Sequence, residues 1–159
     1  MSSMVKGTQQ RQLEFGYRVA KATATFPQST TSTLFTVSGG GVYVTSLFGI
    51  LTVATTTDPQ LTLQYTPTAG TVGVFATTTA IANAEVGAIV TIQPNTGNVG
   101  GGALVAQATS AKAGMPMFMS MPMVFGTTGT IQWKTLASVG GQMKWYITYV
   151  PLDDGAYIS

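Results

Sequence analysis

The residue types that most often perform catalysis or bind metals are scarce in this chain of 159 residues. It has no histidine and no cysteine, and its acids are Glu14, Asp58, Glu85, Asp153 and Asp154. The commonest general base, the commonest metal ligand and the thiol nucleophile are therefore missing. Adjacent residues in an extended chain point apart, so Asp153 and Asp154 do not form the facing pair that a glycosidase needs. We predict no enzymatic activity, no cofactor and no structural metal.

A run of methionines is the next candidate for chemistry. Met115, Met117, Met119, Met121 and Met123 recur at every second position, so an extended chain would place them on one face. Thioethers bind Cu(I), but the histidines and cysteines that usually help them are absent. The two prolines within the run cannot donate ladder hydrogen bonds, which favours an edge strand that something must cover. We predict that the methionines lie in the core or at a subunit interface.

The two tryptophans, Trp133 and Trp145, are the largest apolar side chains and fall in the most regular part of the sequence. Core packing is the simplest interpretation, in which case each indole N–H needs a hydrogen-bond partner. A platform that stacks on sugars or bases is the alternative. It would require both rings to be exposed on one face of the molecule.

The elements that position these residues are predicted to be β-strands. Residues 130–136 and 142–150 alternate between apolar and polar side chains, as strands with one buried face do. The intervening Ser138–Gly141 contains two glycines, so we expect the two segments to form a hairpin. The glycines of Ser38–Gly41 predict a second hairpin, and Gly49 predicts a bulge within a long strand that starts at Val42.

Short strands separated by turn residues every 8–12 positions or so are typical of sandwiches and Greek-key barrels. The segment Gln60–Tyr65, for example, alternates cleanly and is followed by a turn. We therefore predict an all-β fold, an antiparallel β-sandwich or jelly-roll-like domain. Residues 19–159 are expected to form this single domain, and residues 1–18 an extended N-terminal arm.

Composition indicates assembly into something larger. Only 8% of residues are charged, against about 25% in a typical soluble domain, while 45% are hydrophobic. Residues 1–21 nevertheless contain four basic residues and one acid. A basic arm on a nearly neutral body favours docking onto an acidic surface. We expect Lys6, Arg11 and Arg18 to face acidic residues there, and Leu13 and Phe15 to make apolar contacts.

Two other classes of partner are not expected. The body has no basic stripe and no nucleic-acid recognition module, so we predict no nucleic-acid binding. Residues 22–57 carry no charge, but threonines, serines, Pro27 and a glycine triplet interrupt them, so they are not predicted to cross a membrane. The first residues lack the apolar run of a signal peptide.

Several segments together resemble the head decoration, or cement, proteins of tailed bacteriophages, which are small virion proteins rich in threonine and glycine. The C-terminal segment 144–156, KWYITYVPLDDGA, carries most of this resemblance. It is supported by VAKATATFPQ at 19–28, LFTVSGG at 34–40 and TGTIQW at 128–133. The glycine-rich segment at residues 94–102 and the methionine run match no pattern of that family.

This resemblance implies a structural virion protein that binds the outside of a phage head and stabilises the shell. It would be made in the host cytoplasm, with the major capsid protein and further copies of itself as partners. The resemblance also implies a homotrimer, because decoration proteins often occupy three-fold positions. Another virion component of the tail, neck or fibre tip is the first alternative, and a carbohydrate-binding or adhesion module is the second.

Overall fold

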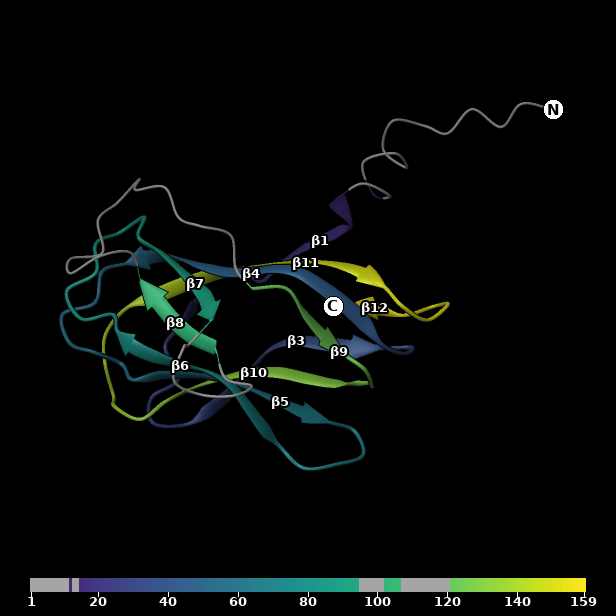
Figure 1. The fold of residues 1–159 in the computed structure, drawn as a ribbon. Helices are drawn as coiled ribbons and strands as arrows, with labels where there is room; N and C mark the ends of the chain where they lie inside the picture. The colour runs from purple at the N-terminus through teal and green to yellow at the C-terminus, as the bar shows by residue number, and fades with distance from the viewer. Residues whose placement is uncertain (1–11, 13–14, 95–101, 107–120) are drawn as a thin grey trace.

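The alternating segments form strands that pack as two antiparallel layers, joined to each other along one side (Figure 1). The computed structural model describes residues 12, 15–94, 102–106 and 121–159. The strands within these residues are numbered β1 to β12 in chain order. The predicted all-β sandwich is thereby confirmed, whereas the more specific jelly-roll topology stays a prediction.

The first layer is built around β11 and β4, the two longest strands of the described chain. In spatial order its strands are β1 (Tyr17–Ala20), β11 (Gln142–Pro151), β4 (Val42–Val53) and β7 (Ile89–Pro94). Two short strands add to it: β2 (Ala24–Thr25) pairs with β11, and β9 (Met123–Phe125) pairs with β4. β1 begins two residues before the predicted start of the body, and forms the free edge of this layer.

The second layer is built around β10, which lies between β3 and β5. In spatial order its strands are β12 (Tyr157–Ile158), β3 (Thr31–Ser38), β10 (Gly129–Thr135), β5 (Leu61–Pro67) and β6 (Gly73–Ala80). β12 is the free edge of this layer. On the other side β8 (Gly102–Ala106) pairs antiparallel with β7 and parallel with β6, and so connects the two layers.

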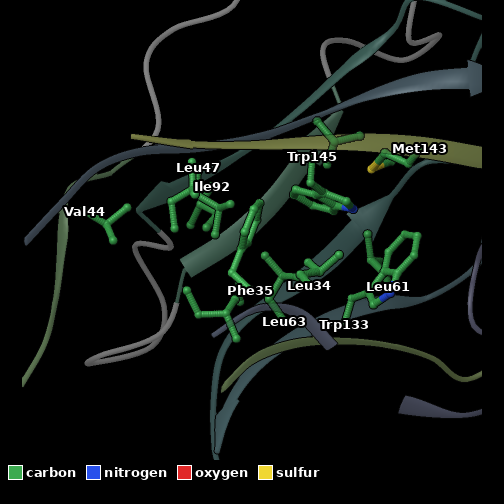
Figure 2. Close-up of a cluster of buried hydrophobic side chains, with 14 of the residues drawn as sticks. Leu34, Phe35, Val44, Leu47, Leu61, Leu63, Ile92, Trp133, Met143 and Trp145 are labelled. Atoms are coloured by element: carbon green, nitrogen blue, oxygen red, sulfur yellow. The ribbon is translucent and has the colours of Figure 1, made fainter. Parts of the chain in front are cut away.

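The core lies between the layers and contains both tryptophans (Figure 2). Trp133 on β10 and Trp145 on β11 are almost completely buried, and their rings meet edge to face at 6.0 Å between centroids. Phe26, which follows β2, packs against Trp133 at 5.6 Å. Every second residue of β10 and β11 faces this core, as the alternation of the sequence predicted. Core packing of both tryptophans is confirmed, and a platform built on them is excluded.

The predicted C-terminal hairpin is wrong, because β10 and β11 do not pair with each other. β10 pairs with β3 and β5, whereas β11 pairs with β1, β2 and β4. The chain between them crosses from one layer to the other, so the two strands face each other across the core. The hairpin predicted at Ser38–Gly41 is wrong for the same reason, since β3 and β4 also lie in different layers. At both crossings, the two strands belong to different layers, and each turns the apolar face of its alternating pattern toward the core between them.

The bulge predicted at Gly49 is also wrong. Gly49 pairs in regular register with Trp145, and the irregularities of the β4–β11 pairing lie on either side, at Gln142/Met143 and Thr148/Tyr149. A Cβ atom at position 49 would lie 2.3 Å from the Met143 sulfur and 3.2 Å from the Trp145 ring. The glycine is required because these two core side chains lie directly over the β4 backbone.

Candidate functional site

The structure describes only some of the predicted interface residues. Six of them lie outside the described residues: Lys6, Arg11, Leu13, Met115, Met117 and Met119. Phe15 is two-thirds exposed, and Arg18 is exposed on the edge strand β1. Only Met121 and Met123 remain from the methionine run.

The end of the methionine run belongs to the fold of the chain itself. Met123 pairs with Val44 of β4 and packs, half-buried, against the core. The Met121 N–H donates a hydrogen bond to the Ile92 carbonyl at 2.9 Å, and its side chain is also half-buried. Met123 therefore contributes to the edge of the core, whereas an interface role for either methionine stays a prediction. The same prediction for the other three is untested.

Arg18 belongs to a cluster on the outer face of the first layer that we call the basic–aromatic patch, formed by Arg18, Phe48, Lys144 and Tyr146. The Arg18 guanidinium carbon lies 4.7 Å from the centre of the Tyr146 ring, and the Lys144 ammonium lies 5.4 Å from it. Phe48 stacks on the same ring at 5.2 Å. Three strands therefore contribute to one patch, in which an aromatic ring restrains two cations.

Strand pairing explains why these residues meet. Tyr146 is directly opposite Phe48 on β4 and Ala20 on β1, so Arg18 is its diagonal neighbour. Lys144 and Tyr146 share a face because they are two positions apart on β11. The sequence predicts that Lys144 and Tyr146 share a face, but it does not predict that Phe48 lies beside them.

Phe48 reaches the outer face through a register shift. Strict alternation from Val42 and Val44 would bury Phe48, but the β4–β11 register shifts at Thr148/Tyr149. As a result Ser46 and Leu47 are both buried, and Phe48 moves to the outer face. Because a bulge is not encoded by hydrophobic period, sequence reasoning missed this member of the patch.

The patch can make two kinds of contact with a macromolecular surface. Its cations attract carboxylates, and the contact of each with the Tyr146 ring contributes roughly 0.5–1 kcal/mol at an exposed site. The aromatic rings offer apolar area beside them. Within the described residues, no three side chains drawn from histidine, cysteine, aspartate and glutamate are grouped so as to hold a metal ion. No helix in that part of the chain has the length and apolar character needed to cross a membrane.

Comparisons of the chain with protein-family models, with curated proteins and with solved structures found no match.

Proposed function

We propose that this protein is a structural virion protein, a decoration or cement protein that binds the outside of a phage head and stabilises the shell. The observation that carries the proposal is the basic–aromatic patch, which concentrates two of the chain's seven basic residues on one sheet face. The C-terminal segment that resembles decoration proteins contributes Lys144 and Tyr146 to the same patch. Sequence resemblance and surface chemistry therefore converge on β11.

The exposed apolar surface of the sandwich also supports binding to neighbouring protein molecules. Several large apolar side chains are exposed by about half or more of their area, among them Val74, Val124 and Leu136. With only 8% charged residues, such a surface gains from being covered by neighbouring molecules. We propose that the neighbours are the major capsid protein and other copies of this chain, arranged as a homotrimer at the capsid surface.

Binding of this kind stabilises a shell without any catalytic group. A protein that binds the assembled shell, and not the separated subunits, shifts the equilibrium toward the shell by mass action. The cations of the patch are already held against a ring, so fewer rotamers are lost on docking. Exposed ion pairs contribute roughly 0–1 kcal/mol each and are weakened by salt. The apolar contacts beside them would supply most of the affinity.

A charge reversal with a matched control tests the docking face. Lys144→Glu reverses a charge within the patch, and Lys134→Glu makes the same change on β10, in the other layer. Co-sedimentation with purified undecorated shells should show that Lys144→Glu weakens binding by about tenfold, the equivalent of 1.4 kcal/mol, while Lys134→Glu binds like the original protein. Equal binding by both variants, or equal loss, would contradict docking through the patch.

Electron micrographs distinguish the alternatives within the virion. A decoration protein adds density over the head, whereas a tail, neck or fibre-tip component adds density elsewhere. The carbohydrate-binding alternative loses the tryptophan platform that it would have required, since both rings lie in the core.

A further inference from the structure

Residues 152–159, which we call the C-terminal strap, leave the first layer after β11 and end on the edge of the second layer (Figure 1). A tight turn begins the strap, closed by a hydrogen bond of 3.1 Å from the Ala156 N–H to the Asp153 carbonyl. The strap then forms β12, which pairs with β3 and with no other described strand. This strand is therefore attached to the sandwich along one side only.

The edge of β3 provides a complete binding site for this strand. Residues 157–158 of β12 pair with residues 37–38 of β3. Beyond them, Ser159 and Thr36 exchange two backbone hydrogen bonds of 3.0 and 2.8 Å. The Ile158 side chain is buried and belongs to the core of the sandwich. If the strap left, the same backbone groups and the same apolar position would be open to another strand.

The turn of the strap can open at Asp154 and Gly155. Before these residues, a carboxylate oxygen of Asp153 accepts a hydrogen bond of 2.6 Å from the Gly41 N–H, which fixes the start of the strap. Asp154 is exposed, and a Cβ atom at Gly155 would meet no atom within 4 Å. Opening here would release one edge strand and leave the pairing of the other described strands intact. Local opening of this kind requires less free energy than global unfolding.

We propose that copies of this chain exchange their C-terminal straps, so that β12 of one copy occupies the β3 edge of the next. The occupant is a second copy because the site already fits residues 157–159 of this sequence, in its backbone hydrogen bonds and in its buried Ile158 position. The exchanged contact is identical to the closed one, so exchange is a low-cost route to an oligomer. The inference rests on the proposed self-association, but not on attachment to a shell.

Exchange in one direction also explains how an oligomer could close. Each copy donates its strap and accepts another at the β3 edge, so the two contact surfaces of one copy differ. Contacts of this head-to-tail kind form a ring when the rotation between neighbours closes. The proposed homotrimer would be such a ring.

Cross-linking of introduced cysteines tests the exchange, because the chain has no cysteine of its own. Ser38→Cys and Tyr157→Cys are combined in one chain, since these residues lie directly opposite each other on β3 and β12. Opposite Cα atoms in an antiparallel pair are about 4.5–5.5 Å apart, within the range that a disulfide spans. A chain with Thr31→Cys and Tyr157→Cys is the control, because Thr31 is at the far end of β3.

The two oxidised proteins are compared on denaturing gels without reductant. Exchange predicts covalent multimers of the Ser38→Cys/Tyr157→Cys chain and none of the control chain. Monomers closed by an internal disulfide, no disulfide at all, or equal multimers in both chains would overturn the proposal. Sedimentation of the unmodified chain separates this result from the proposed self-association. Oligomers whose variant forms only internal disulfides would refute exchange alone, whereas a chain that stays monomeric would refute both.

A substitution within the turn gives a second test. Gly155 has a φ of 80° in the closed turn, a conformation that a valine residue strongly disfavours. Because an opened strap releases this constraint, Gly155→Val should lower the protein concentration at which oligomers dissociate by about tenfold. Gly126→Val is the matched control, because a Cβ there also meets no atom within 4 Å and its φ lies outside the left-handed region. An unchanged or higher dissociation concentration for Gly155→Val would contradict exchange through this turn.

Discussion

At the scale of single residues, two buried threonines differ in whether their hydroxyls are satisfied. Thr55 donates a hydrogen bond to the Ile81 carbonyl at 2.7 Å and accepts one from the Ala84 N–H at 3.2 Å. Thr135, at the end of β10, is completely buried, and its hydroxyl has no partner among the described residues. The same side chain is therefore favourable in one place and unfavourable in the other.

Replacing each threonine by valine, which has nearly the same shape, should change stability in opposite directions. Thr135→Val should raise the free energy of unfolding by about 1 kcal/mol, because an unpaired buried hydroxyl is removed. Thr55→Val should lower it by about 1–3 kcal/mol, because the Ala84 N–H loses its acceptor. Urea unfolding of the three proteins measures both changes. A loss of stability in Thr135→Val as large as that in Thr55→Val would show that the Thr135 hydroxyl is paired.

Individual residues of the core and of the patch were predictable to different degrees. The burial of Trp133 and Trp145 followed from alternation, and Arg18 was predicted at an interface from the charge of the arm. The contact between Arg18 and Tyr146 was not predictable, because it depends on which strand lies beside β11.

At the scale of strands, hydrophobic period predicts which face is buried but not which strands pair. A hairpin and a crossing between layers produce the same alternation in both segments, since each buries one face. The connection between β10 and β11 is longer than the two-residue loops that most strongly favour a hairpin. At its end Gly141 has a φ of 129°, and a Cβ there would lie 2.6 Å from the Phe26 ring. This glycine allows the crossing chain to pack on the core.

The close contact between β4 and the core side chains of β11 can be tested at one glycine. Gly49→Ala would push a methyl group into the Met143 side chain and the Trp145 ring, and should lower the free energy of unfolding by about 1–3 kcal/mol. Gly73→Ala on β6 is the control, because no atom lies within 4 Å of a Cβ there. Thermal unfolding should show Gly73→Ala to be neutral or slightly stabilised. Equal stability of the two variants would contradict the packing over Gly49.

At the scale of the whole molecule, the fold class was predictable because turn spacing and alternation are local signals. The order of the strands was not, because it is set by contacts between residues far apart in sequence. Residues 17–25 illustrate the difference: β1 and β2 both pair with β11, but residues 21–23 separate them.

The N-terminal arm should be needed for shell binding but not for folding of the body. β1 starts at Tyr17, so deletion of residues 1–16 leaves each strand of the described body intact. We predict that the shortened protein keeps its β-type circular dichroism and melts within a few degrees of the full chain. It should fail to bind shells, because Lys6, Arg11, Leu13 and Phe15 are removed. Apolar anchors such as these contribute about 1.5–3 kcal/mol each when fully buried. Shell binding equal to that of the full chain would contradict a docking role for the arm.

The most direct measurement of the proposed function is cryo-electron microscopy of virions assembled with and without this protein. A decoration protein predicts density on the outer head surface that disappears when the protein is absent and returns when the purified protein is added. The returned density should accommodate the two-layered sandwich, with the basic–aromatic patch facing the shell. A head surface that is identical in both preparations, or a difference confined to the tail, neck or fibre tip, would contradict the proposed function.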